Sequence, residues 1–209
     1  MIKVRQALKS WPWLLGALFG YYLPWVWHPA AALTANAYDL AEWANLHPAY
    51  SQRTPMLAPF LLRFDLAGIA VLCALRAARA TTCGVRWLYA GLSLILAITL
   101  LPPIDFFRSA GDDPNYRQQF YIAVATAIAL AMIAFLWRKS ILPRYQAILE
   151  ALLALATLIA AIMGEGLAFG VIRSLQIDVT PGGGIIVFVV FMLLALIAAP
   201  LASVPASVP

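Results

Sequence analysis

The chain has 209 residues, of which 64% are hydrophobic and only 11% are charged, and its mean hydropathy is +0.86. A soluble core of this size cannot bury so much apolar surface, so the composition excludes an ordinary soluble protein and indicates a membrane protein. The formal net charge is +5. The distribution of charge between the loops, described below, accounts for this excess without nucleic acid as a partner.

Six stretches are long and apolar enough to be predicted as membrane-spanning helices, because the bilayer core needs roughly 20 mostly apolar residues per helix. They lie at about Trp11–Trp27, Met56–Leu75, Trp87–Phe107, Phe120–Trp137, Ala147–Val171 and Ile185–Ala202. The first, WPWLLGALFGYYLPWVW, lacks a small-residue cleavage site, so we expect it to be retained as a belt-anchored peripheral helix. The sequence predicts one all-α polytopic transmembrane domain over residues 1–209.

The basic residues predict that the N- and C-termini are both cytoplasmic. In this orientation nine of the 14 Lys and Arg residues lie on the cytoplasmic side and five on the outer side, as the positive-inside rule expects. Eight of the nine acidic residues lie on the outer half, and the exception is Glu150. We therefore expect a multi-pass protein of the bacterial cytoplasmic (inner) membrane.

The first outer loop contains a short predicted helix. Thr34 or Asn36 can cap its N-terminus, and the helix is expected to run to His47. Leu40 and Trp43 lie on its apolar side or at the edge of that side, so we predict an interfacial helix in the plane of the lipid headgroups with these two residues as anchors.

The second stretch carries two charges, Arg63 and Asp65, where lipid is expected. About 12 residues separate Arg63 from Arg76, which is roughly 18 Å of helix and too short to cross a bilayer. Arg63 and Asp65 must therefore be submerged. Two positions apart on a helix, they point to different sides and need separate partners. Glu165 in the fifth stretch lies at a comparable depth, so we predict that Arg63 pairs with Glu165.

Glycines beside Glu165 favour this pairing, since Gly166 and Gly170 have the small-xxx-small spacing that lets another helix approach. The candidate partners of Asp65 are water, Tyr21, Tyr22 and Arg108. We interpret the three buried charges first as structural groups that fix helix packing. A proton or quinone site and a substrate path are the alternatives.

Candidate ligands for metals or cofactors are few. Asp39 and Glu42 could share a cation, although a solvated helix face is the simpler interpretation. His28 could ligate a pigment magnesium or form interfacial hydrogen bonds. Cys73 and Cys83 do not form a C-x-x-C motif, and neither histidine lies within a span, which argues against haem, thiol and histidine-dependent sites. We predict no catalytic residues, metal or cofactor, and leave lipid, quinone and pigment contacts open.

The segment from Tyr21 to Pro48, YYLPWVWHPAAALTANAYDLAEWANLHP, resembles a segment of polytopic accessory membrane subunits from green filamentous phototrophs, of the kind found in alternative complex III, a quinol-oxidising assembly. The resemblance covers about an eighth of the chain and transfers no site residues. It implies a photosynthetic or respiratory membrane, a large complex with cytochrome and iron-sulfur subunits, and a non-catalytic role in that complex.

Two functions follow as expectations. The first is a non-enzymatic accessory or structural subunit of an energy-converting electron-transport complex, with other integral-membrane subunits and lipid as partners. The second is a small secondary transporter, or a proton- or quinone-linked protein, that uses the charges of the second and fifth spans. A transporter built from two inverted repeats would place equivalent residues of the second and fifth spans at opposite depths in the membrane. Arg63, Asp65 and Glu165 all lie on the outer half, which argues against this architecture.

Overall fold

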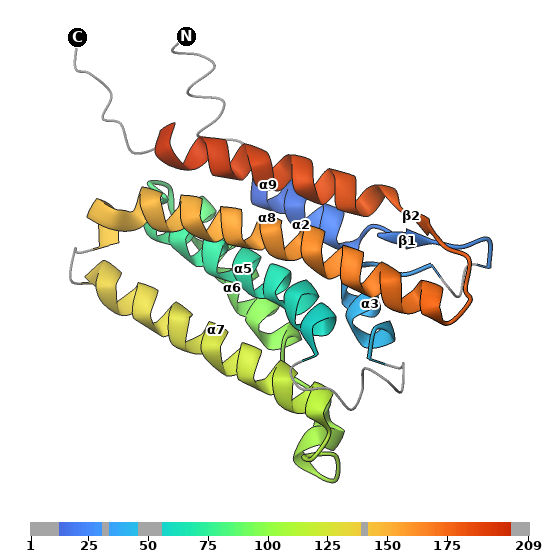
Figure 1. Cartoon of the computed structure of the whole chain (residues 1–209). Helices are drawn as coiled ribbons and strands as arrows, with labels where there is room; N and C mark the ends of the chain where they lie inside the picture. Colours follow the sequence, from blue (N-terminus) through green and yellow to red (C-terminus); the bar gives the residue numbers. More distant parts are fainter. Residues whose placement is uncertain (1–12, 31–33, 46–55, 139–141, 202–209) are drawn as a thin grey trace.

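The computed structural model describes residues 13–30, 34–45, 56–138 and 142–201. Its elements, in chain order, are α2 (Trp13–Tyr22), β1 (Val26–Trp27), α3 (Ala37–Trp43), α5 (Leu57–Arg79), α6 (Cys83–Thr99), the 3₁₀ turn η2 (Ile104–Phe107), α7 (Pro114–Arg138), α8 (Leu142–Ser174), β2 (Thr180–Pro181) and α9 (Gly183–Leu201) (Figure 1). The prediction of an all-α fold is confirmed for this part of the chain, since the two strands have only two residues each.

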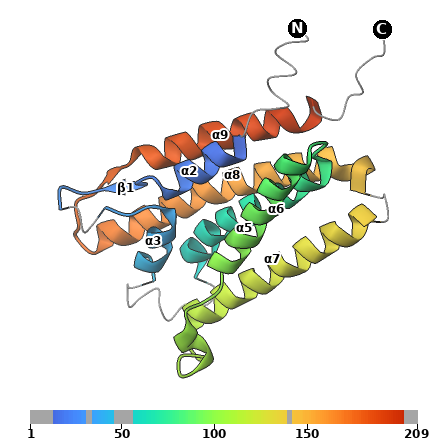
Figure 2. The same ribbon diagram turned by 180° about the vertical axis from the view of Figure 1, so that it is seen from behind.

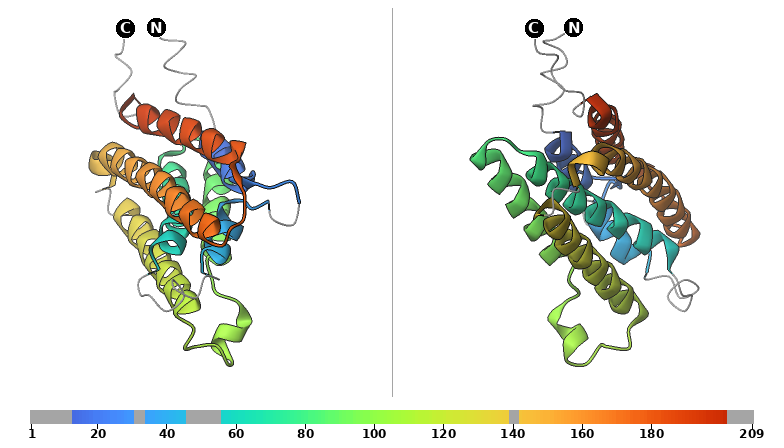
Figure 3. Two further views of the ribbon diagram at one scale, coloured as in Figure 1. Left: turned by 45° about the vertical axis from the view of Figure 1, so that its right-hand side comes forward. Right: turned by 90° about the vertical axis from the view of Figure 1, so that its left-hand side faces the viewer.

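Helix α5 occupies the centre of the bundle and packs against α8, α6, α7, α3 and α2 (Figure 2). Helix α9 lies over α2 and α8 on one side, and α7 lies on the far side of α5 (Figure 1). The long helices alternate in direction. One end of the bundle, which we call the α3 end, holds α3, η2 and both strands, and the other, the Thr82 end, holds the turn between α5 and α6 (Figure 3).

Three helical segments of the described chain are long and apolar enough to cross a membrane: Leu57–Arg79, Pro114–Arg138 and Tyr145–Ser174. Two shorter apolar segments, Cys83–Thr99 and Gly183–Ala199, accompany them. The three longer segments correspond to the second, fourth and fifth predicted spans. The architecture is therefore that of a helical bundle compatible with a membrane protein.

The structure differs from the prediction in the first and third stretches, and proline explains both differences. Helix α2 ends at Tyr22, because Pro24 cannot continue a helix and disfavours helical backbone in the residue before it. Its 10 residues span roughly 15 Å. Helix α6 ends at Thr99, shortly before Pro102 and Pro103, and the chain then forms η2 rather than continuing to Phe107 as a helix.

Helices α2 and α9 pack closely because α2 carries glycine where the two backbones meet. A Cβ atom on Gly20 would lie 2.5 Å from the backbone nitrogen of Phe188, and one on Gly16 would collide with the ring of Phe191. These two glycines form a G-x-x-x-G sequence, the spacing that brings helices together in membranes. Gly166 and Gly170 were predicted to admit a neighbouring helix, but a Cβ atom on either would meet no atom of the described residues within 4 Å, so no described helix approaches them as predicted.

The segment after α2 is held by backbone hydrogen bonds from the start of α9. The amide of Gly182 donates to the carbonyl of Trp25 at 2.6 Å, and the amide of Gly184 donates to the carbonyl of Pro24 at 2.8 Å. Strands β1 and β2 pair antiparallel beside these bonds. Tyr21 and Trp25 are fully buried here, so these two aromatic residues pack inside the protein instead of forming part of an interfacial belt.

Candidate functional site

Arg63 lies fully buried in the first half of α5 and joins three elements at the α3 end. Its Nη2 group donates to Glu42 of α3 in an ion pair. Its Nη1 group donates to Oδ1 of Asn115 in α7 at 2.7 Å, and Nδ2 of Asn115 donates to the other carboxylate oxygen of Glu42 at 3.1 Å. We call these three mutually bonded side chains, Glu42, Arg63 and Asn115, the Arg63 cluster.

The local sequence at two helix starts positions the partners of Arg63. Helix α3 begins after Asn36, whose side-chain oxygen accepts a hydrogen bond from the amide of Asp39 at 3.0 Å, so the predicted cap by Asn36 is confirmed. Helix α7 begins with Pro114, and Oδ1 of Asp113 accepts from the amide of Asn115 at 2.8 Å. An aspartate cap followed by proline is a helix-start signal, and it fixes Asn115 in the first turn.

The predicted pair between Arg63 and Glu165 is wrong. No basic side chain of the described residues lies within ion-pair distance of Glu165, which is only partly buried on α8. The reason is the direction in which Arg63 points. Helix α8 meets the face of α5 that carries Leu62, since Gly164 lies against Leu62, whereas Arg63 is turned by about 100° from that position toward α3 and α7.

The prediction that Leu40 anchors helix α3 in lipid is wrong. Leu40, expected to be a lipid anchor, is fully buried, as are Ala37 and Ala41, because α3 packs against α5, α8 and α2. Trp43 is partly buried. The apolar face of a helix must be buried against either lipid or protein, and the sequence periodicity is the same in both cases. The pattern therefore did not distinguish them. Glu42, expected on a solvated face or at a cation, keeps 39% of its side chain exposed and also binds Arg63. His47 lies outside the described residues.

A second charged cluster joins α5 to α8 at the Thr82 end. Glu150 of α8 is 1% exposed and lies 3.4 Å from Nε of Arg76 and 3.3 Å from Nη1 of Arg79. Nε2 of Gln146 donates to Glu150 at 3.1 Å and also to the carbonyl of Leu75. No partner was predicted for Glu150, although the sequence contains a signal: it is the single acidic residue of the half of the chain assigned to the cytoplasmic side.

Asp65 has none of its predicted protein partners. It is fully buried, and neither carboxylate oxygen accepts a hydrogen bond from the described residues. The Tyr21 hydroxyl donates instead to the carbonyl of Leu62 at 3.2 Å. Tyr22 and Arg108 are exposed. On α8, the hydroxyl of Thr157 is likewise buried without a partner among the described residues.

Few described residues are arranged to hold a cofactor. Within those residues, no group of three or more His, Cys, Asp or Glu side chains lies together as a metal site. Nδ1 of His28 accepts a hydrogen bond from the amide of Ala30 at 3.0 Å. Cys73 is buried and Cys83 is exposed, and both are free thiols. The arrangement of charges therefore connects helices at both ends of α5 and leaves Asp65 between the two clusters.

Comparison of this chain with protein-family models, with curated proteins and with solved structures finds no match.

Proposed function

We propose that this chain is a non-catalytic integral-membrane subunit with a structural role in a larger electron-transport complex of the bacterial cytoplasmic membrane. The observation that supports this proposal most is the use of charge on α5. Arg63 at one end and Arg76 and Arg79 at the other are all bonded to acidic side chains of α3 or α8. Charges committed to ion pairs between helices hold a bundle together. The assignment to electron transport rests on the resemblance of residues 21–48.

The outer faces of α7 and α8 support a location within a bilayer. Large apolar side chains are exposed along both helices. On α7 they include Val124, Ile128, Met132 and Phe135, and on α8 they include Ile148, Leu152, Ile159 and Ile162. Such continuous apolar surfaces are rare on soluble proteins. In a membrane they are covered by lipid tails or by helices of partner subunits.

We also propose six membrane segments with both termini on the cytoplasmic side. The basic residues of the described chain support this orientation, because Arg76, Arg79, Arg86 and Arg138 gather at the Thr82 end while most acidic residues belong to the α3 end. In this arrangement α2 crosses only part of the membrane. The first membrane segment then continues through β1, and the last consists of β2 and α9.

The orientation predicts opposite labelling of two thiols. Asp112 is fully exposed in the loop before α7, so Asp112→Cys in a Cys83→Ser background is expected to react with a membrane-impermeant maleimide in sealed cells. The native Cys83, exposed at the Thr82 end, is expected to react only after the membrane is permeabilised. Cys73 is buried and serves as the internal control. Labelling of Cys83 in sealed cells contradicts the proposed orientation.

A second candidate function is a proton-linked or quinone-linked carrier, and Asp65 is the observation that favours it. A fully buried carboxyl group without a hydrogen-bond partner among the described residues is a costly feature within a membrane helix and often belongs to a proton path. It lies on α5, which packs extensively on α8, and these two helices correspond to the second and fifth spans expected to carry the charges of a transporter.

Gentle solubilisation followed by native electrophoresis tests the proposed function. We expect the tagged chain to migrate with a much larger assembly that contains haem, and Asp65→Asn to leave both this migration and the activity of the assembly unchanged. A stable isolated oligomer of this chain contradicts the subunit role. Normal assembly of Asp65→Asn together with a loss of proton-linked uptake or quinol turnover supports the second candidate instead.

A further inference from the structure

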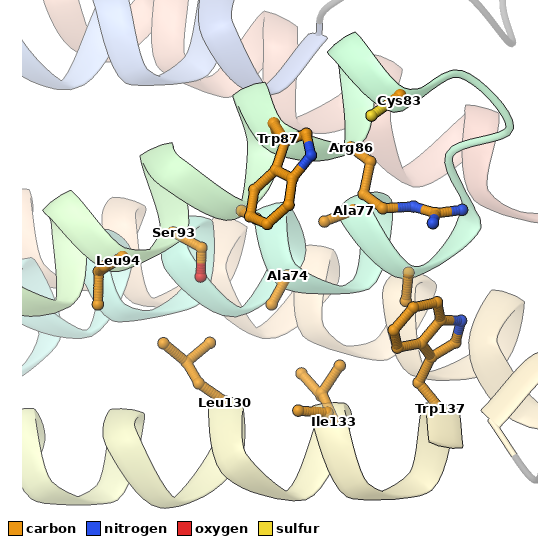
Figure 4. A pocket seen from close by; sticks show the side chains of 13 residues that line it. Ala74, Ala77, Cys83, Arg86, Trp87, Ser93, Leu94, Leu130, Ile133 and Trp137 are labelled. Carbon is orange, nitrogen blue, oxygen red and sulfur yellow. The ribbon is translucent and has the colours of Figure 1, made fainter. Parts of the chain in front are cut away.

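A groove of about 500 Å³ opens between α6 and α7 at the Thr82 end of the bundle (Figure 4). Both helices pack on α5 but only slightly on each other. The α5 side of the groove carries three alanines, Ala74, Ala77 and Ala78, and small side chains there leave the space open. The volume lies within the range of pockets that hold small molecules.

The walls of the groove are apolar along most of its length. Leu94 lines it from α6, and Leu130 and Ile133 line it from α7 (Figure 4). Among the residues that line it, Arg86 alone is charged, and none is acidic. A long apolar surface with one cation at its end is suited to an amphipathic ligand that carries negative charge on its polar part.

Arg86 lies at the polar end of the groove beside the start of α6. Its guanidinium carbon is 5.3 Å from the ring centre of Trp137. Its Nη2 group donates to the carbonyl of Ala80 at 3.0 Å, whereas its Nε group is buried and has no hydrogen-bond partner among the described residues. Thr82 precedes α6 without a side-chain cap. The Arg86 guanidinium therefore lies beside the segment that leads into α6, and the start of that helix has no side-chain cap. A cation close to an uncapped helix N-terminus is a combination that favours an anion.

Ser93 places a buried hydroxyl beside the groove that an acyl chain does not bond, so this residue distinguishes a lipid chain from other ligands of the groove. Its side chain lines the groove and is directed into it from α6 (Figure 4). It is 3% exposed, and its hydroxyl has no hydrogen-bond partner among the described residues. Ser93 lies seven positions after Arg86, or roughly 10 Å along the helix. The hydroxyl thus lies beside the apolar part of a ligand whose polar group is at Arg86. Only a ligand with a hydrogen-bond acceptor about this far from its polar group could bond to Ser93.

We propose that the groove binds one acyl chain of an anionic phospholipid, with the lipid phosphate at Arg86 and the N-terminus of α6. The inference rests on the proposed membrane location of the chain. Arg86 belongs to the end of the bundle where Arg76, Arg79 and Arg138 also lie, so the groove opens toward the more positive side of the protein. One arginine near an anionic lipid surface gives roughly a fivefold preference over a zwitterionic lipid.

Native mass spectrometry of the full chain in detergent tests this site with two lipids of identical acyl chains, dioleoyl phosphatidylglycerol and dioleoyl phosphatidylcholine. We expect one tightly retained phosphatidylglycerol, with roughly fivefold weaker retention of phosphatidylcholine. Arg86→Gln is expected to remove the preference for phosphatidylglycerol, and Ala90→Phe, which fills the groove, to remove binding of both lipids. Arg117→Gln, at an exposed arginine of the α3 end, is the matched control and is expected to change neither.

Three results overturn the proposal. Equal retention of both lipids, or a phosphatidylglycerol preference that survives Arg86→Gln, excludes a headgroup site at Arg86. Tighter binding of oleate than of phosphatidylglycerol assigns the groove to a free fatty acid. Ser93→Ala is expected to bind phosphatidylglycerol as the wild type does, and a loss on this substitution indicates a ligand with a deep carbonyl group. Because the chain is purified and folded in each case, the result is independent of whether it assembles with partner subunits.

Discussion

Replacing Arg63 by alanine is expected to lower the free energy of unfolding by about 3 to 5 kcal/mol. The loss arises because the buried Asn115 loses the donor to its side-chain oxygen, the partly exposed Glu42 loses its ion pair, and an empty space remains in the protein. Glu42→Ala is expected to destabilise the fold by about 3 kcal/mol, because the fully buried guanidinium of Arg63 then keeps its charge without a counter-ion. Reversible unfolding in mixed detergent micelles measures both losses.

A double variant tests whether Arg63 pairs with Glu42, as in the Arg63 cluster, or with Glu165, as depth along the helices predicts. Arg63→Leu with Glu42→Leu is expected to recover part of the loss, since no unpaired charge remains. Glu165→Ala is the matched control, because it removes an acid of the same α5–α8 region that lies outside ion-pair distance of any described basic side chain. Its effect is expected to be small and additive with Arg63→Ala. Coupling of Arg63 to Glu165, with none to Glu42, contradicts the structure of this cluster.

Gly20→Ala is expected to destabilise the bundle by about 3 kcal/mol, the upper part of the range for overpacked cores. The added methyl group would lie 2.5 Å from the backbone nitrogen of Phe188. A backbone cannot move aside as a side-chain end can, so α2 and α9 must separate along their contact. Gly16→Ala is expected to cost less, because the nearest atoms to its methyl group belong to the ring of Phe191, which can turn.

Gly166→Ala provides the matched control for Gly20→Ala. Both substitutions add one methyl group to a glycine within an apolar helix, but a Cβ atom on Gly166 of α8 meets no described residue within 4 Å. Alanine also has the better helix propensity, so Gly166→Ala is expected to be neutral or slightly stabilising. Thermal unfolding in detergent compares the two variants. Equal losses at both positions would show that helix propensity or lipid contact, rather than close packing of α2 on α9, governs these glycines.

The sequence predicted well the helices that length and apolar composition alone can identify. Three predicted spans correspond to α5, α7 and α8 because each is a long, nearly uninterrupted apolar stretch, and such a stretch can satisfy its backbone hydrogen bonds only within itself. The cap of α3 by Asn36 was predictable for a similar reason, since a cap depends on neighbours only three residues away. Local chemistry fixes these features without knowledge of the packing.

The partners of the buried charges depend on packing and were predicted incorrectly. Depth along a helix follows from counting residues, and by that measure Glu165 is a good match for Arg63. Which neighbour faces Arg63 depends on how the bundle is arranged around α5, and the sequence does not specify this arrangement. Glu42 was assigned to solvent because its helix has an apolar side that suited lipid equally well. The structure covers that side with α5 and α8, and Glu42 then reaches Arg63.

Two local signals in the first stretch carried more information than the prediction used. Gly16 and Gly20 have the close-packing spacing, and Pro24 is a helix terminator within the apolar run. Hydropathy averaged over the stretch concealed both, because aromatic residues on each side kept the average high. Gly182 and Gly184, at the start of α9, supply the amides that bond to Trp25 and Pro24.

The hydrogen bonds between the segment after α2 and the start of α9 have a consequence for biosynthesis. Thr180 bonds to the carbonyl of Trp27 across 153 positions of sequence. At the usual pace of translation the ribosome needs on the order of ten seconds to add that many residues. Throughout this interval the carbonyls of Pro24 and Trp25 lack their final donors, and water or the insertion machinery must satisfy them. The segment after α2 is thus among the last to gain its hydrogen bonds, and a nascent chain that stops before Gly182 would be a strong substrate for quality-control proteases even with both charged clusters formed.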